Sequence, residues 1–427
     1  MTYSGIAIFF VVVVLYAIFA NRLARFSITM PMVFVLVGVF TSARFLNLIS
    51  LPIQAKDIEL LTEITLALLL FADATTLSYL KLQQDTRLPG RLLLIGMPLT
   101  ILFGAVVAFI FFHEQGIWFA FLIAAILTPT DAALGLPIFN NPKVPVRIRR
   151  ALNVESGIND GIATPFVTVF LILAVAESTP SLAEAPVLAL KQVGIALGVG
   201  TLVGFGGGRL FNWAADRRWS SSTGEQVGSV ALALAAFEAS TALGGNGFIA
   251  AFIGGLFFGY FSRGRHHASV EFSETLGVLL SLFVWTVFGS SLGAELLFSF
   301  NPKALLYGLL SITLIRMLPV AISMIGEHFR WDTLGIMGWF GPRGLASVVF
   351  TLLAFETFQE FGHDYSLLFQ MAGWTIFLSV ILHSLTALPL ANWYSRRVQA
   401  AAPDSPELVD VGEIKAPRSR RITSSDQ

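Results

Sequence analysis

The chain has 427 residues, of which 55% are hydrophobic and 13% charged, and its mean hydropathy is +0.75. A water-soluble protein of this length needs far more charge to cover its surface, so the composition predicts a protein dissolved in a lipid bilayer. Lys plus Arg and Asp plus Glu balance at 27 each, which gives no basic surface for nucleic acid, and the absence of cysteine excludes disulfides and thiolate chemistry.

Long apolar segments follow one another with short polar connections, which predicts an all-α polytopic membrane protein. About 13 segments approach the roughly 20 residues that cross a bilayer. The first has no basic region before it and no clear cleavage site, so we expect a retained helix. Residues 1–395 then form one transmembrane domain, and the polar residues 396–427 are expected to form a disordered cytoplasmic tail. The predicted spans centre on residues 5–20, 29–43, 58–79, 92–112, 117–139, 151–175, 187–211, 226–243, 246–262, 274–294, 304–325, 333–355 and 366–393.

Positive charge alternates between the loops. One set of alternate loops carries 17 Lys and Arg residues, whereas the other carries 4, namely Arg44, Lys56, Lys191 and Lys303. Because Lys and Arg concentrate in cytoplasmic loops, we expect the N-terminus outside, the tail inside and an odd number of spans in the plasma (inner) membrane.

The span at 151–175 contains several polar groups on one face. Glu155, Ser156, Asn159 and Asp160 fall within an arc of about 140° on a helix. Asp160 comes ten residues after Arg150, which places it about 15 Å deep, near the bilayer midplane. These groups could simply hydrogen-bond neighbouring helices. A carboxylate at that depth is costly, however, and favours a functional site.

Two features, one on each side of this span in the sequence, predict broken helices. Pro129 lies in the sequence Leu127–Asp131 and removes a backbone donor, which indicates either a kink or a break that frees carbonyls near Thr128 and Thr130. Residues Gly341–Gly344 form a second break with Arg343 inside it. If two six-helix inverted repeats flank a linking span, these breaks occupy matching positions, and Arg343 offsets the dipoles of crossed half-helices.

Other polar residues within the spans receive simpler interpretations. Arg316 and Glu155 are predicted at similar depth and are paired to avoid two isolated buried charges, in a structural or a mechanistic role. Asp73 either caps a helix or joins the site, Glu238 reaches water or lines a cavity, and His383 is expected to be a hydrogen-bonded bundle histidine. The glycines between 204 and 208 predict close helix packing.

At these residues the sequence resembles the NhaP/NHE-type sodium/proton antiporters of the cation:proton antiporter superfamily. Order and spacing suit that family across most of residues 1–395, although many members have proline directly after the aspartate at position 131, where this chain has Ala132. The resemblance is carried by Thr130, Asp131, Glu155, Ser156, Asn159, Asp160, Arg316, Pro319 and the segment Gly341–Gly344.

The resemblance implies an NhaA-like fold of 13 helices, with a dimerisation part, a mobile core where two broken helices cross, and hence a homodimer. It implies that Asp160 binds the cation or the proton and that Asn159 marks the electroneutral branch. Thr130 and Ser156 then join Asp160 as ligands of the monovalent cation. Glu155 assists them while paired with Arg316, and the role of Asp131 stays open.

The function expected from these features is secondary transport, not enzyme catalysis. An ionised Asp160 is a hard oxygen ligand for a small cation, and protonation removes that charge, so one carboxylate cannot hold both. We therefore predict electroneutral 1:1 exchange of Na⁺ for H⁺ with no cofactor. The alternatives are K⁺/H⁺ exchange, a cation-coupled symporter and, more remotely, an intramembrane aspartyl protease that uses Asp131 and Asp160.

Overall fold

The computed structural model of the chain describes residues 3–48, 56–80, 86–139, 141–177, 184–262, 265–296, 298–362, 366–400 and 405–409. All regular elements within these ranges are helices. The protein is an integral membrane protein, because seven helical runs in the described part are long and apolar enough to cross a bilayer.

Every predicted span overlaps a helix or an interrupted helix. The first eight spans correspond to α1 (Tyr3–Ala24), α2 (Met30–Thr41), α3 (Lys56–Leu80), α4 (Arg87–Arg91) with η1 (Leu92–Gly96), α5 (Met97–Phe112) and η2 (His113–Gln115), α6 (Ile117–Ile126) with α7 (Ala132–Phe139), α8 (Val146–Glu177), α9 (Ala185–Asp216) and α10 (Ser222–Ala242). The remaining five correspond to α11 (Gly247–Ser262), α12 (His267–Phe288) with η4 (Gly289–Gly293) and α13 (Ala294–Leu296), α14 (Pro302–Ile312) with α15 (Leu314–Ser323), α16 (Trp331–Trp339) with α17 (Leu345–Glu360), and α18 (Ser366–Gln399).

One interruption was not predicted. The helix that spans residues 302–323 breaks at Thr313, whose backbone has φ −114° and ψ −98°. The Thr313 hydroxyl donates a hydrogen bond to the Leu309 carbonyl at 2.6 Å. Such back-bonding competes with the helical ladder and can bend a helix without any proline or glycine to signal it.

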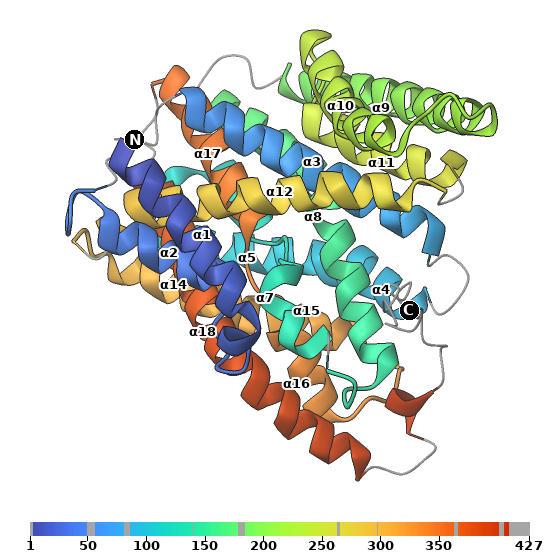
Figure 1. Cartoon of the computed structure of the whole chain (residues 1–427). Coiled ribbons are helices and arrows are strands. Elements are labelled where there is room, and N and C mark those ends of the chain that lie inside the picture. Colours follow the sequence, from blue (N-terminus) through green and yellow to red (C-terminus); the bar gives the residue numbers. More distant parts are fainter. Residues whose placement is uncertain are drawn as a thin grey trace.

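The helices fall into two packed groups (Figure 1). In one group α3 packs along α11 and α12, and α9 packs along α11. In the other, α6 packs against α5 and α8, while α18 packs against α7 and α14. The broken helices α6–α7 and α16–α17 both belong to the second group, which therefore positions the site described below.

A close approach of backbones joins α9 to α11. A Cβ atom added at Gly204 would overlap the carbonyl of Gly254, and one at Gly208 would press on Phe261. The close helix packing predicted from residues 204–208 is therefore confirmed. Gly206, on the same helix, has open space where its Cβ would be.

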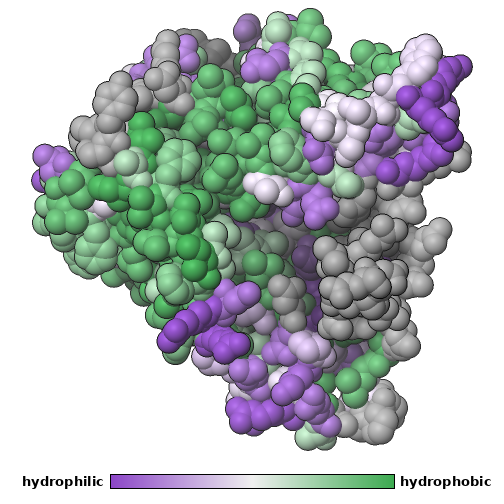
Figure 2. Space-filling model, in the orientation of Figure 1, coloured by the Kyte–Doolittle hydropathy of each residue, from purple (hydrophilic) through white to green (hydrophobic). Residues whose placement is uncertain are grey.

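Much of the surface is apolar, as expected for contact with lipid (Figure 2). Residues on α1 and α9 illustrate this, since Ile18 is 67% exposed and Leu202 is 74% exposed. Hydrophilic residues gather toward the ends of the molecule and in a hollow near its middle (Figure 2).

The C-terminal region differs from the prediction in two ways. Helix α18 continues to Gln399, past the boundary expected at residue 395. Within the predicted disordered tail, the short 3₁₀ helix η5 (Pro406–Leu408) packs against the bundle. Arg147 donates to the Pro406 carbonyl at 2.8 Å, and the buried Glu407 accepts a bond from the backbone N–H of Arg330 at 3.0 Å. These polar contacts, which the apolar pattern cannot reveal, hold η5 in place.

The contact between α9 and α11 generates a stability prediction. Replacing Gly204 by Ala forces the two backbones apart, and we expect a loss of about 1–3 kcal/mol. The matched Gly206→Ala change meets no neighbour, and its better helix propensity should leave stability unchanged or higher by up to about 1 kcal/mol. Thermal unfolding of the detergent-purified variants measures both effects. Equal melting temperatures for the two variants would contradict this packing.

Candidate functional site

Two broken helices cross at the centre of the site. Helix α6 ends at Ile126 and α7 begins at Ala132, while α16 ends at Trp339 and α17 begins at Leu345. The backbone N–H of Asp131 in the first break donates to the Pro342 carbonyl in the second at 2.8 Å. The Ser347 hydroxyl also donates to the Ile126 carbonyl at 2.7 Å. Both predicted breaks are confirmed, and they are in direct contact.

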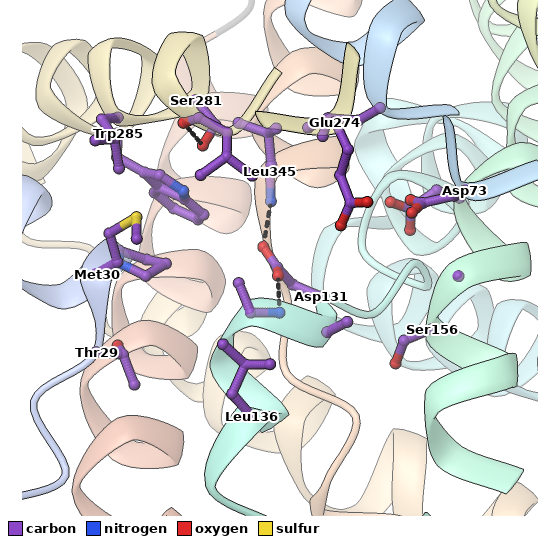
Figure 3. A pocket seen from close by; sticks show the side chains of 18 of the residues that line it. Thr29, Met30, Asp73, Asp131, Leu136, Ser156, Glu274, Ser281, Trp285 and Leu345 are labelled. Carbon is purple, nitrogen blue, oxygen red and sulfur yellow. Dashed lines mark hydrogen bonds between the residues drawn. The ribbon is translucent and has the colours of Figure 1, made fainter. Parts of the chain in front are cut away.

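Asp131 joins the N-terminal ends of two half-helices. Its Oδ1 accepts a hydrogen bond from the Ala133 N–H at 2.7 Å, and its Oδ2 accepts one from the Leu345 N–H at 3.1 Å (Figure 3). The first turn of a helix has unpaired N–H groups and a partial positive charge. The Asp131 carboxylate thus satisfies and neutralises the starts of α7 and α17 together.

Arg343 binds carbonyl groups at the C-terminal ends of helices. Its guanidinium is fully buried and donates to the carbonyls of Thr128 at 3.3 Å, Gly341 at 3.2 Å and Ser311 at 3.1 Å. Thr128 follows the end of α6 and Ser311 lies in the last turn of α14, where unpaired carbonyls carry partial negative charge. This geometry fits the predicted role of Arg343 in offsetting half-helix dipoles.

Glycine is required at two positions of the second break. A Cβ at Gly344 would overlap the Asp131 side chain, and a Cβ at Gly341 would overlap the Arg316 guanidinium. Any larger residue would therefore push the aspartate or the arginine away from the crossing.

A hydrogen-bonded cluster links the first break to α8. The Asn159 Nδ2 donates to Thr130 Oγ1 at 2.6 Å, and the Thr130 N–H lies 3.3 Å from Asn159 Oδ1. The hydroxyls of Thr130 and Ser156 are 3.0 Å apart. Three predicted site residues therefore meet, and Asn159 holds the unwound segment against α8.

Asp160 lines a cavity of about 490 Å³ together with Asp131 and Ser156. Its Oδ1 is buried and accepts no hydrogen bond from the described residues. Figure 3 shows the cavity with Asp131 and Ser156 among its labelled walls. Of the predicted ligands, Asp160, Asp131 and Ser156 line this cavity, whereas Thr130, Asn159 and Glu155 are not among its described lining residues.

The predicted pairing of Glu155 with Arg316 is confirmed. Arg316 Nη2 lies 2.6 Å from Glu155 Oε1 and 2.8 Å from Oε2, and both side chains are almost fully buried. The four predicted site residues of α8 therefore contact different neighbours. Glu155 pairs with Arg316 on α15, Asn159 bonds to the first break, and Ser156 and Asp160 line the cavity.

The remaining polar residues take the following positions. Asp73 on α3 lines the cavity, and so does Glu274 on α12, which sequence reasoning missed. An acidic residue within an apolar span was the available signal for Glu274. Glu238 is exposed and absent from the described cavity lining. His383 is buried, with Nδ1 2.9 Å from the Ser379 carbonyl, as expected for a hydrogen-bonded bundle histidine.

Comparison with known families gives one match that covers most of the chain. Residues 8–393 match the family described as "Sodium/hydrogen exchanger, transmembrane". A solved structure of the sodium proton antiporter MjNhaP1 from Methanocaldococcus jannaschii at pH 8 superposes with a TM-score of 0.73 at 21% identity, covering 91% of this chain and 98% of that one. This likeness establishes the fold.

Two curated relatives match about two thirds of the chain. The K(+)/H(+) antiporter NhaP of Alkalimonas amylolytica is 27% identical over 293 residues, which cover 68% of this chain and 50% of the relative. The Na(+)/H(+) antiporter ApNhaP of Aphanothece halophytica is 25% identical over 311 residues, covering 69% and 57%. The chain thus spans about half the length of these curated relatives.

The buried ion pair generates a prediction about stability. Glu155→Gln or Arg316→Gln alone leaves an uncompensated buried charge and should cost about 3–5 kcal/mol, whereas the double variant should recover part of that loss. Thermal unfolding of the wild type, both single variants and the double variant measures the coupling.

The exposed pair of Arg265 and Asp216 is the control. Their side chains are 55% and 58% exposed and lie 2.9 Å apart. Because solvent screens such a pair, the same cycle there should give a coupling below about 1 kcal/mol. Strictly additive losses for Glu155 and Arg316 would show that the buried contact carries no stability.

Proposed function

The chain belongs to the transmembrane sodium/hydrogen exchanger family, and from this premise we propose that it exchanges one monovalent cation for one proton across the membrane. The observation that carries the proposal is the Asp160 carboxylate. One of its oxygens is buried without a hydrogen-bond donor among the described residues, and it lines a cavity beside two broken helices. A buried acceptor of this kind suits either a proton or a cation.

Exchange follows from competition at that carboxylate. When ionised, Asp160 offers a hard anionic oxygen to a small cation, and Ser156 and Thr130 contribute neighbouring hydroxyl oxygens. When protonated, Asp160 loses its charge and its attraction for the cation. If only a loaded, neutralised site crosses the apolar barrier, each cation that moves one way requires a proton to move the other way.

The proposed ratio of one cation to one proton in each transport cycle follows from the residues around Asp160. Asn159 cannot ionise and is committed to Thr130 through two contacts. Asp131 is adjacent, but each of its oxygens accepts a backbone N–H bond that its protonation would weaken. We therefore assign exchange to Asp160, helix neutralisation to Asp131 and Arg343, and support of α8 to Glu155 with Arg316.

Two cations are candidates for the substrate. We take Na⁺ first, since a hard oxygen site near a half-helix break suits it, and K⁺ is the alternative because one NhaP relative is named a K(+)/H(+) antiporter. The intramembrane protease alternative loses support, because its chemistry needs two carboxylates that share a proton, whereas both oxygens of Asp131 accept backbone bonds.

We also propose an orientation of the chain in the membrane and a homodimeric assembly. The loops rich in Lys and Arg are assigned to the cytoplasm of the plasma (inner) membrane. Ala24 and Ser27, which lie next to Arg22 and Arg25 in the sequence, line the cavity, so we assign the cavity to the cytoplasmic side. A homodimer is included because the family resemblance implies one.

Asp160→Asn tests the proposed function. The variant should fold, because a buried amide costs less than a buried charge, but it should not exchange, because an amide cannot release a proton. Proteoliposomes that contain a pH indicator report proton movement on addition of Na⁺ or K⁺. The control is Asp216→Asn, which makes the same substitution at an exposed carboxylate and should transport like the wild type. Substantial cation-driven proton movement by folded Asp160→Asn protein would refute the assignment.

A further inference from the structure

Three polar side chains on one face of α18 lie against the second helix break. Ser379, His383 and Thr386 stand at positions i, i+4 and i+7, which share one side of an α-helix. Helix α18 packs along α7 and α14 and also contacts α16 and α17 (Figure 1). Because polar groups inside a bilayer need partners, the partners of this face indicate its role.

This face of α18 is attached to the break at two points. Trp339, the last residue of α16, donates its indole N–H to the Thr386 hydroxyl at 2.9 Å, and its ring centroid lies 4.8 Å from that of His383. Further along, the backbone N–H of Arg343 donates to the Ser379 hydroxyl oxygen at 2.6 Å. Helix α18 therefore holds the unwound segment where it leaves α16 and again just before α17 begins.

His383 supports the Ser379 side chain. The His383 Nδ1 lies 2.9 Å from the Ser379 carbonyl oxygen and 3.2 Å from the Ser379 hydroxyl oxygen. A carbonyl oxygen only accepts hydrogen bonds, so Nδ1 carries a hydrogen and donates it toward Ser379. Both side chains are fully buried, and the hydroxyl oxygen stays in place as the acceptor for Arg343.

The peptide group between Pro342 and Arg343 is bound at both of its ends. Its N–H donates to Ser379 on α18, and its C=O accepts the Asp131 N–H from the first break at 2.8 Å. A trans peptide group is planar, and its N–H and C=O point in opposite directions. The acceptor at Ser379 therefore fixes the direction of the Pro342 carbonyl, and that carbonyl fixes the backbone at Asp131.

The backbone at Asp131 in turn positions Thr130, which the proposed function uses as a cation ligand. Thr130 directly precedes Asp131, and its hydroxyl lies 3.0 Å from that of Ser156, which lines the cavity with Asp160. A continuous series of covalent and hydrogen bonds thus runs from α18, through one peptide group, to the ligands beside the cavity.

We propose that Ser379 is a positioning residue for cation binding, which acts through the Pro342–Arg343 peptide group without touching the ion. The proposal rests on the proposed function and adds to it a residue outside the two breaks and α8. Without the Ser379 hydroxyl, the buried Arg343 N–H loses its acceptor, so the peptide group is free to turn. Thr130 then loses its fixed position, and the cation binds more weakly, while the Asp160 carboxylate is unchanged.

Ser379→Ala in proteoliposomes tests the proposal. The half-saturating concentration of Na⁺ (or of K⁺, where the wild type prefers it) should rise about threefold to tenfold, and the maximal rate should stay within about twofold, because the loss is in binding. Ser379→Thr keeps the hydroxyl and should bind the cation like the wild type. If Ser379→Ala does not fold, Ser379→Cys replaces it, with a rise in the same direction because sulfur is a weaker acceptor.

The matched control is Ser384→Ala. Ser384 is also a fully buried serine of α18, and its hydroxyl lies 2.6 Å from that of Thr29, which precedes α2. This variant loses a buried hydrogen bond of similar length away from the break. Thermal unfolding should show similar losses of stability for Ser379→Ala and Ser384→Ala, whereas the half-saturating concentration should change only in Ser379→Ala.

Amide hydrogen exchange, followed by mass spectrometry, measures the same link without transport. In Ser379→Ala the fragment that contains Asp131 should exchange about threefold to tenfold faster, because the Asp131 N–H loses the fixed Pro342 acceptor. In Ser384→Ala the same fragment should exchange at the wild-type rate.

The outcomes separate this inference from the proposed function. An unchanged half-saturating concentration in folded Ser379→Ala, or an equal rise in Ser384→Ala, overturns the inference, as does a folded Ser379→Thr protein that behaves like Ser379→Ala. A fall in maximal rate alone also overturns it, because the hydroxyl would then act on a step after binding. Failure of the wild type to move protons with any monovalent cation would refute the proposed function, and hydrogen exchange would still decide whether Ser379 holds the first break.

Discussion

The structure depends on one electrostatic problem and its solution: helix ends that meet inside an apolar bundle must be neutralised. Two helix breaks bring unpaired N–H groups and unpaired carbonyls together inside the bundle, where they need polar partners. Asp131 bridges the starts of α7 and α17, and Arg343 collects the carbonyls at the ends of α6 and α14. The absence of a side chain at Gly344 lets Asp131 approach, so the crossing is specified by a glycine, an acid and a base.

This arrangement leaves Asp160 as the carboxylate available for exchange. Glu155 is neutralised by Arg316 in a buried pair, and both oxygens of Asp131 accept backbone N–H bonds, so a change of charge on either residue would weaken these contacts. Asp160 has an unpaired oxygen in the described structure and faces the cavity. In the proposed mechanism the charges of Glu155, Arg316, Asp131 and Arg343 stabilise the helix arrangement, and the Asp160 carboxylate binds either a cation or a proton.

Much of the fold and of the candidate site could be predicted from the sequence, because the patterns that indicate them lie within short segments of the chain. Apolar run length predicted the helices, Pro129 and Gly341–Gly344 predicted the breaks, and similar depth predicted that Glu155 meets Arg316. The break at Thr313 could not be predicted, because a threonine hydroxyl bonding to Leu309 has no distinctive sequence pattern. The contact of Asp131 with the Leu345 N–H joins residues 214 positions apart, and Glu274 meets the cavity only through the packing of α12 on α3. Such non-local contacts require the tertiary structure.

In the proposed mechanism Asp160 alone changes its charge during transport, while Asp131 keeps its charge. A measurement of Na⁺-driven proton movement in proteoliposomes under a membrane potential set with valinomycin and K⁺ tests it most directly. If one proton exchanges for one Na⁺ and Asp131 remains a helix cap, neither the rate nor the endpoint should respond to the potential. A strong shift of either with potential would show that net charge moves in each cycle. That result would contradict the account and identify Asp131 as the second titrating group.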